Sequence, residues 1–324
     1  ATIDATGDVP KIVARLSSTR FDINDVNPPA KGGASKASTS GGATGGGTST
    51  ASSDGRLIPN DPLPLDVMKS VDADIEYNAA TFVATVAELT DFEIKIVLEN
   101  GKLDVSPFKA GVGAGTLEGA ISLDGSQENA PVSISIDGKQ MGLESLLAGA
   151  GMRDKIVGPL DVNIDLKGAG ASPRAIAGSL TGNTLVSLYD SRVLKKAFED
   201  AMGETLAGLL ATENGWVVID CAVLDYDIQD GLMETKAGFT ASGPVTVITD
   251  GTISLKTEEL DLTAKPAGGG GFTSVPLVIQ GTFANPSVIP DPQAIGLGIV
   301  TGLLTGGIAP ALLAVVGDLP ADHP

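Results

Sequence analysis

The chain has almost none of the Cys and His residues on which much nucleophilic and zinc chemistry depends. The sequence contains one Cys and one His, Cys221 and His323, and the His is the penultimate residue. A lone Cys can form neither an intrachain disulfide nor a Cys-based zinc site. A Ser-His-Asp or Cys-His arrangement would need a histidine at the frayed end of the chain. We therefore expect no enzyme, and no catalytic residue, cofactor or metal site.

Carboxylates are abundant, but their spacing fits no known site. Asp161, Asn163 and Asp165 resemble the start of a calcium loop, but the glycine and the glutamate required later in the loop are missing. The residues between them are apolar, so this motif indicates the polar face of a strand. Glu258 and Glu259 could act as an acid–base pair in a hydrolase. Among 40 acidic residues, however, chance neighbours are common, and a solvated surface is the favoured interpretation.

The charge balance argues against nucleic acid as a partner and against attraction to an anionic membrane. The 324-residue chain has 40 acids, 21 bases and a formal net charge of -19. Nucleic-acid binding needs clustered Lys and Arg, so we expect no nucleic-acid partner. Attraction to an anionic membrane through a basic patch is disfavoured for the same reason.

The elements that position the apolar residues are predicted to be strands. Residues 92–99 alternate apolar and polar, and Asn100 and Gly101 follow, which is the strongest short hairpin signal. Residues 132–137 and 160–167 alternate in the same way, which is typical of antiparallel sheets with one apolar face. Two segments favour helices instead: residues 192–211, with Ser191 as N-cap, and residues 143–152.

These apolar strand faces must be covered by something. Few helices are predicted, so either two halves of the sheet pack on each other or a curved sheet leaves an apolar channel for an apolar ligand. The stretch 294–317 carries no charge and is long enough to cross a bilayer, but it contains several glycines and Pro310. Packing on the sheet, contact with a membrane and crossing of a membrane all remain open for it.

Composition divides the chain into four parts. Residues 1–26 form a strand element, which we interpret as continuing from a missing N-terminal part because the chain starts in mid-pattern without Met. Residues 27–57 are rich in Gly, Ser and Thr and indicate a flexible linker. Residues 58–292 form the β domain, and residues 293–324 an apolar C-terminal helical segment and tail.

Several segments, in their order and spacing, resemble the AsmA family. Leu98–Phe108 resembles the family's "dG-L-l-pl" segment, and a Gly-rich strand follows it in both. The other resembling segments are Gly158–Asp161, Leu166–Ser172, Ala177–Gly182, Gly251–Leu255, Leu260–Leu262, Val275–Pro286 and Gly7–Ile12. The resemblance covers most of residues 1–26 and 60–292, and the family defines no catalytic or metal residue that could be transferred.

The resemblance implies a fold and a role. AsmA-like proteins are anchored in the inner membrane of Gram-negative bacteria, project into the periplasm and are regarded as bridge-like lipid transfer proteins. The expected fold is mainly β: a long, curved, twisted antiparallel sheet forming a groove or half-barrel, with a few amphipathic helices and the apolar C-terminal helical segment. The chain would be the C-terminal periplasmic region of such a protein.

The expected function is therefore non-enzymatic binding and transport of phospholipid or another acyl-chain lipid between inner and outer membrane. Membrane contact through 294–317 and envelope protein partners are further expectations. The alternative is a structural or partner-docking β module with a closed, dry core. The lipid-facing candidates are Phe92, Ile94, Ile96, Leu98, Leu103, Val105, Val132, Ile134, Ile136, Leu160, Val162, Ile164 and Leu166.

Overall fold

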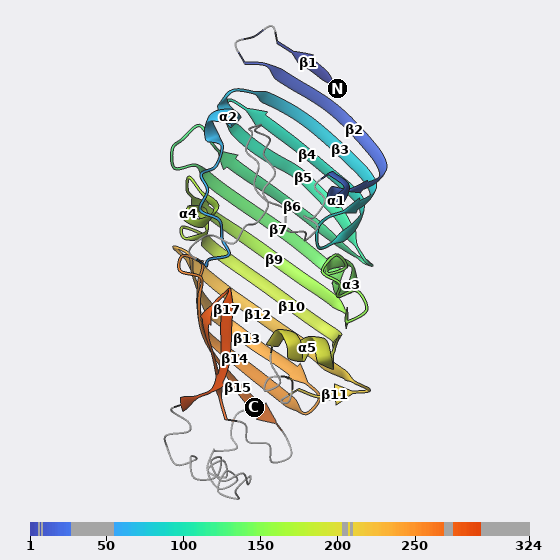
Figure 1. Cartoon of the computed structure of the whole chain (residues 1–324), viewed down its shortest axis with the longest axis vertical. Coiled ribbons are helices and arrows are strands. Elements are labelled where there is room, and N and C mark those ends of the chain that lie inside the picture. Colours follow the sequence, from blue (N-terminus) through green and yellow to red (C-terminus); the bar gives the residue numbers. More distant parts are fainter. Residues whose placement is uncertain are drawn as a thin grey trace, which may run out of the picture.

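One large β-sheet dominates the chain. The computed structural model describes residues 1–5, 7, 9–26, 55–202, 207, 210–268 and 275–292. All the strands in this part belong to one 17-stranded sheet, which is curved and open (Figure 1). The predicted mainly β fold is confirmed. Of the predicted linker 27–57, the structure describes only residues 55–57, and the predicted helical segment 293–324 lies outside the described residues.

The strands and helices have the following bounds. The strands are β1 (Thr2–Asp4), β2 (Lys11–Asp22), β3 (Asp72–Val83), β4 (Glu88–Glu99), β5 (Lys102–Val112), β6 (Gly115–Asp124), β7 (Pro131–Gly142), β8 (Ile156–Val157), β9 (Pro159–Ala169), β10 (Thr181–Leu194), β11 (Thr212–Glu213), β12 (Trp216–Gln229), β13 (Leu232–Ser242), β14 (Val245–Ser254), β15 (Glu259–Gly268), β16 (Leu277–Thr282) and β17 (Asn285–Pro290). The helices are α1 (Ile23–Val26), α2 (Leu65–Lys69), α3 (Leu143–Leu146), α4 (Pro173–Ala177) and α5 (Lys195–Met202).

The strands follow one another across the sheet nearly in chain order. Each pairs antiparallel with the next, and the short β8 and β11 lie beside β10 and β12. The exception is β2, which pairs parallel with β3 in the register Lys11 to Asp72. The sheet is therefore mixed rather than wholly antiparallel as predicted. The reason is the long connection 23–71. It lets β3 start on the same side of the sheet as β2, as a parallel pair requires.

The antiparallel connections alternate between two rims of the sheet. One rim carries α2, α4 and the tight turns at Asn100 and Asp230, and we call it the α4 rim. The other carries α1, α3 and α5, and we call it the α5 rim (Figure 1). At the predicted hairpin, Asn100 and Gly101 have φ angles of 52° and 77°. Two successive left-handed residues match the right-handed twist of the flanking strands, and the hairpin prediction is correct.

The helices are short, and the predicted ones begin or end elsewhere. β10 continues through Leu194, so the helix predicted over 192–211 begins only at Lys195. Ser191 is a buried strand residue, not an N-cap, and its Oγ donates to the Tyr189 carbonyl. Pairing of β10 with β8 and β12 outweighs the helical pattern there. α3 ends at Leu146, before Gly149 and Gly151. Among the described helices, none has the length and apolar character needed to cross a bilayer.

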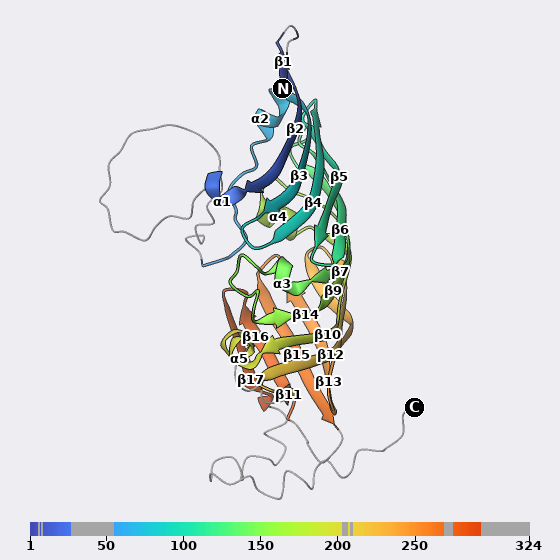
Figure 2. The same ribbon diagram turned by 90° about the vertical axis from the view of Figure 1, so that its right-hand side faces the viewer.

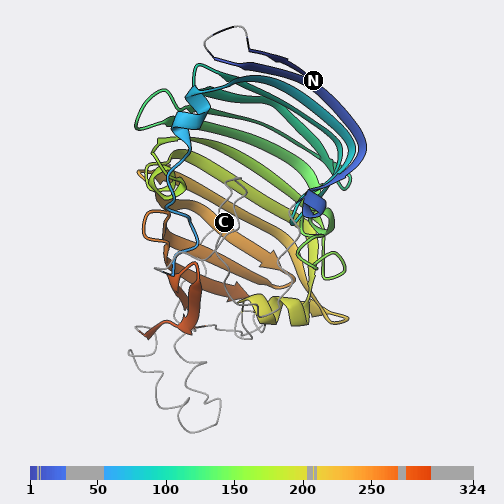
Figure 3. The same ribbon diagram turned by 45° about the horizontal axis from the view of Figure 1, so that its top comes forward.

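The five helices of the described residues lie on the same side of the sheet, which is its concave side (Figure 2). The strands also bend along their length, so the sheet forms a broad gutter between the two rims (Figure 3). Non-glycine residues with left-handed φ angles contribute to this bend near the α5 rim. Asp91 in β4 (φ 46°) and Asp190 in β10 (φ 45°) interrupt the regular alternation of side chains. Consequently Leu89 and Phe92, three residues apart, contribute to one core cluster.

Candidate functional site

The concave side, which we call the groove face, carries apolar side chains in rows that cross the strands. The clearest row is formed by Cα partners paired directly from one strand to the next. Its members, from β3 to β9, are Ile75, Ile96, Val105, Ile121, Ile134 and Leu166. We call this set the central row. Directly opposed side chains of this kind contact each other, so the row forms a continuous apolar line across the strands.

The lipid-facing candidates all lie on the groove face. Beside the central row, Leu98 and Leu103 pair with each other, and Leu103 continues through Leu123 to Val132. On the other side, Ile136 pairs with Ile164. Ile94 and Val162 pack against the core cluster that contains Phe92 and Leu160. The structure thus brings the candidates of β4, β5, β7 and β9 onto one face, and contact with lipid remains a prediction for them.

Much of this face is still accessible. Among the candidates only Phe92, Val132, Leu160 and Leu166 are buried, with exposed fractions of 6, 8, 9 and 8%. The other candidates are partly exposed, and Ile121 in the middle of the central row is 40% exposed. Leu16 on β2, paired with Tyr77, is 48% exposed. The two halves of the sheet therefore do not cover each other here, and the groove face has an open apolar floor.

Aromatic residues gather at one place on this face. Phe82 stacks on Phe92 with ring centroids 4.3 Å apart, and Phe21 stacks on Phe82 at 5.5 Å. Phe108 meets Phe92 edge-on at 5.7 Å, and the Tyr77 ring lies 6.0 Å from Phe92. Such pairs add to the stabilisation from burial alone. The cluster joins β2, β3, β4 and β5 and closes part of the groove floor near the α5 rim.

The helices cover the groove face only near the rims. Leu143 and Leu146 of α3 pack in the cluster that holds Phe92. Ile176 of α4 packs against the cluster of Leu166 and Tyr226, and burial of Tyr226 raises the pKa of its hydroxyl. Phe198 of α5 packs near β14 and β16. The central row between β3 and β7 receives no such cover from the described helices.

A strap of chain runs along the α4 rim, and a buried carboxylate from another part of the chain holds one end of it. Residues 55–69, which include α2, form this rim strap, which descends from α2 along the edge of the sheet (Figure 1). The amide N–H groups of Leu57 and Ile58 donate to the two carboxylate oxygens of Glu258, at 2.6 and 3.0 Å. Glu258 lies in the turn between β14 and β15 and is only 1% exposed. Its carboxylate therefore anchors the strap.

The strap also contacts the turns farther along the same rim. The Arg174 guanidinium of α4 donates to the Ile58 carbonyl at 2.9 Å, and the Leu63 amide donates to the Ala171 carbonyl at 2.8 Å. Met68 of α2 lies against Gly125, where a Cβ atom would be 3.2 Å from the methionine methyl group. The strap thus connects the ends of strands from β6 to β15.

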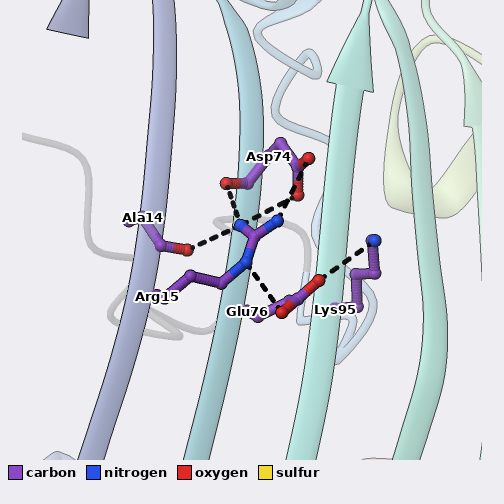
Figure 4. Close-up of polar contacts among 5 residues, drawn as sticks. All are labelled: Ala14, Arg15, Asp74, Glu76 and Lys95. Atoms are coloured by element: carbon purple, nitrogen blue, oxygen red, sulfur yellow. Dashed lines mark hydrogen bonds and ion pairs between the residues drawn. The ribbon is translucent and has the colours of Figure 1, made fainter. Parts of the chain in front are cut away.

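The convex side, which we call the outer face, carries ion pairs between strands at its β2–β5 end. Arg15 of β2 binds Glu76 through Nε at 2.7 Å and Asp74 through a terminal nitrogen at 3.2 Å (Figure 4). Lys95 of β4 binds the other oxygen of Glu76 at 3.1 Å. Each exposed pair stabilises the fold by less than about 1 kcal/mol. Together they connect the parallel pair β2–β3 to β4.

The acid motifs of the sequence do not form reaction centres. Asp161 accepts a hydrogen bond from the Gln140 amide at 2.5 Å and from the Tyr189 hydroxyl at 3.2 Å, on the outer face. Burial and the nearby Asp161 charge raise the pKa of Tyr189. Glu258 holds the strap, whereas Glu259 is exposed. Among the described residues no cluster of three His, Cys, Asp or Glu side chains could hold a metal ion.

Sequence reasoning missed several groove residues. Ile121 and Leu123 alternate with Ser122 and Asp124, so the period of two could have identified Ile121. Leu16 lies in the alternating stretch near the N-terminus, where the same period of two places it on one face of a strand. The roles of Glu258 and of the aromatic cluster depend on contacts between residues distant in the sequence, and no local pattern indicates them.

Comparison with known proteins agrees with this architecture. A protein-family model described as "AsmA family" matches residues 5–236. The chain is 25% identical over 272 residues to the AsmA family protein YhjG of Escherichia coli K12, covering 81% of this chain and 40% of that protein. The chain thus spans about two fifths of the length of this curated relative. No solved structure matches the chain significantly.

Proposed function

The chain belongs to the AsmA family, and from this premise we propose that it is a non-enzymatic lipid-binding and lipid-transport module of the cell envelope. Membership of the family points to a role in assembly of the envelope and outer membrane. On this proposal the ligand is phospholipid or another acyl-chain lipid. Its chains lie on the groove face.

The open central row is the observation that carries this proposal. Neighbouring strands lie about 4.8 Å apart, so the row from Ile75 to Leu166 is roughly 24 Å long. The acyl chains of one leaflet occupy roughly 15 Å, half of a hydrocarbon core of about 30 Å. An extended acyl chain therefore fits along the row with room for movement. The groove-face positions in the rows described above are apolar residues, Tyr77 or glycine.

The energetics suit transport rather than tight capture. Burial of each CH₂ group stabilises a bound chain by about 0.8 kcal/mol, whichever part of the row it contacts. Positions along the row therefore differ little in affinity, and a chain can shift from one to the next. A polar headgroup remains at the open rims, where it stays in contact with water.

The location of this activity follows from the same proposal. The chain acts on the periplasmic side of the inner membrane, within a parent protein that is anchored there. Residues 294–317 contact a membrane, and envelope proteins act as partners. The transfer of lipid from the inner to the outer membrane is an activity of the whole parent protein.

Photocrosslinking tests the proposal with two isoleucines on opposite faces. Ile121 on the groove face is 40% exposed, and Ile248 on the outer face is 51% exposed. Each is replaced separately by a photoreactive phenylalanine analogue, and the purified protein is irradiated with phosphatidylethanolamine and analysed by mass spectrometry. We expect a lipid adduct at position 121 and none at position 248, because only the groove face is proposed to hold acyl chains.

Two results would contradict the proposal. Equal adducts at both positions would indicate nonspecific coating of the sheet by lipid. Absence of an adduct at 121, together with no lipid in an organic-solvent extract of the mildly purified protein, would favour the alternative: a structural or partner-docking β module.

A further inference from the structure

The outer face carries an exposed apolar patch that the proposed lipid function does not use. Val223 of β12 pairs with Phe239 of β13, and Phe239 pairs with Ile248 of β14, so the three form one row. Leu185 of β10 pairs with Asp225, which lies two residues after Val223 on β12. Leu185, Phe239 and Ile248 are 38, 37 and 51% exposed. We call Leu185, Val223, Phe239 and Ile248 the outer strip.

The direction of these side chains follows from their neighbours. Val247, the residue before Ile248, is buried in the core cluster with Ala264 and Leu277. Leu224, the residue after Val223, packs against the groove-face cluster of Leu166 and Tyr226. Since successive side chains of a strand point to opposite faces, Val223 and Ile248 point to the outer face. Phe239 pairs with both of them and so shares this face.

Acidic side chains border the outer strip on one side. Asp225 follows Val223 by two residues and Asp250 follows Ile248 by two residues, so both share the outer face. Beyond them lie further carboxylates on β12, β13 and β15: Asp227, Glu234 and Asp261. The bases nearby are Lys236 and Lys265, and Lys265 pairs with Ile248.

The ion pairing here differs from that at the other end of the outer face. Between β2 and β7, several acids on this face pair with bases, as in Arg15–Glu76, Lys109–Glu118 and Lys139–Asp137. In the part of the chain that the structure describes, none of the five carboxylates beside the outer strip forms an ion pair. The outer strip therefore lies beside a group of carboxylates that have no ion-pair partner among the described residues.

We propose that the outer strip is a docking site for a partner protein, through an amphipathic segment with an apolar face and a row of Lys or Arg along one edge. Exposed apolar rows of this kind mark interaction surfaces in soluble domains. The acids select a basic edge by charge complementarity and set the orientation of the segment. A second copy of this chain, with its net charge of -19, would meet the strip with like charge. An anionic membrane would be repelled for the same reason.

Two synthetic peptides test the proposal on the full chain. Both carry fluorescein and the same helical Leu face, and one has Lys and the other Glu at the polar positions. Binding is measured by fluorescence anisotropy. The test variant is F239S/I248S on the outer strip, and the matched control is L16S/I121S, which removes two comparably exposed apolar residues from the groove face. Circular dichroism melting verifies that both variants fold.

The expected outcome separates apolar from charge contributions. The Leu/Lys peptide binds the wild-type chain, and binding weakens about ten-fold or more in F239S/I248S but little in L16S/I121S, as for truncation of central contacts. In D225N/D250N, binding weakens at low salt and its salt dependence becomes shallower, because the charge attraction is reduced. The Leu/Glu peptide binds much more weakly than the Leu/Lys peptide.

Four results would overturn the proposal. One is failure of the Leu/Lys peptide to bind the wild-type chain. Another is equal binding of the Leu/Glu peptide. A third is a loss of binding in L16S/I121S that matches or exceeds the loss in F239S/I248S, which would place the peptide in the groove. The fourth is binding of the wild-type chain to neutral phosphatidylcholine vesicles that is lost in F239S/I248S, which would identify a membrane-contacting surface.

Discussion

At the scale of single residues, the face on which a side chain lies decides what it can contribute. Ile121 and Ile248 have the same chemistry and similar exposure, yet one lies in an apolar row of the groove and the other beside Asp250 on the outer face. The alternation of side chains along each strand predicts that two faces exist. It does not predict which apolar residues remain exposed, because that depends on which rim helices reach them.

The Asp124 carboxyl gives a prediction that depends on pH. Hydrogen bonds from Ser126 and Gln127 to the carboxylate lower the pKa of Asp124 from 3.8 to about 2. Because the folded-state pKa lies below the unfolded value, the resulting stabilisation is present above about pH 4 and is lost as the pH falls towards 2. An NMR titration of Asp124 in the folded chain is expected to give a pKa near 2.

The variant S126A/Q127A provides the comparison for this titration. Without the two side-chain donors, the pKa of Asp124 is expected to rise towards 3.8. A pKa that stays near 2 in this variant would show that the nearby Lys102 charge or the backbone sets the value instead. The effect on stability is small, because Asp124 titrates in contact with water.

At the scale of elements, the rim strap is the part of the fold that the sequence predicts least well. Residues 55–57 were assigned to a flexible linker, yet Leu57 and Ile58 donate hydrogen bonds to the buried Glu258. The helix predicted over 192–211 begins later than predicted, at Lys195, for a related reason. The apolar spacing was helical, but the strand β10 gained partners in β8 and β12. In both places long-range pairing outweighed local composition, whereas the Asn100–Gly101 turn needed no distant partner and was predicted correctly.

Replacing Glu258 tests whether its carboxylate holds the strap. In E258Q one carboxylate oxygen becomes an NH₂ group, which cannot accept a hydrogen bond from the strap amides. We expect the strap to open more easily by about 1–3 kcal/mol, the cost of leaving a buried group without its partner. Hydrogen exchange is then expected to accelerate at residues 57 and 58, with little change at the β4–β5 turn.

The matched control for this variant is E259Q. Glu259 is the neighbouring exposed acid, and its carboxylate accepts from the Thr257 hydroxyl at 2.7 Å, whereas the amides of Leu57 and Ile58 donate to Glu258. Similar acceleration of exchange in both variants would mean that net charge, and not the buried carboxylate, holds the strap in place.

At the scale of the whole molecule, the chain is one long sheet whose strands contact mainly their immediate neighbours. Its buried side chains fall into several clusters rather than one core, for example around Phe92, around Tyr226 and around Val247. The family resemblance predicted the curved, grooved sheet correctly. Alternation alone favours a closed, packed sandwich over an open groove, because close-packed interiors are the commoner outcome and period-two patterns do not report how far a sheet curves.

This organisation predicts unfolding in more than one step. Because the cluster around Phe92 lies on strands β3–β10 and the cluster around Val247 lies on β14–β17, the two ends of the sheet can open separately, as in repeat proteins. Native-state hydrogen exchange at increasing urea concentration is expected to resolve at least two groups of amides, one in β3–β7 and another in β13–β16. A single group that opens with the same free energy and the same urea dependence throughout would contradict this expectation.

The alternation of connections between the two rims limits how such a sheet can change in length during evolution. Insertion of a single strand would reverse the direction of every later strand, and each later turn and helix would move to the opposite rim. Insertion of a hairpin keeps all of them in place and lengthens the groove by roughly 10 Å, two strand spacings. Paired strands are therefore the unit of growth of this architecture. Among the described strands, the junction of β2 and β3 is the one place where two paired strands run in the same direction and this alternation is interrupted.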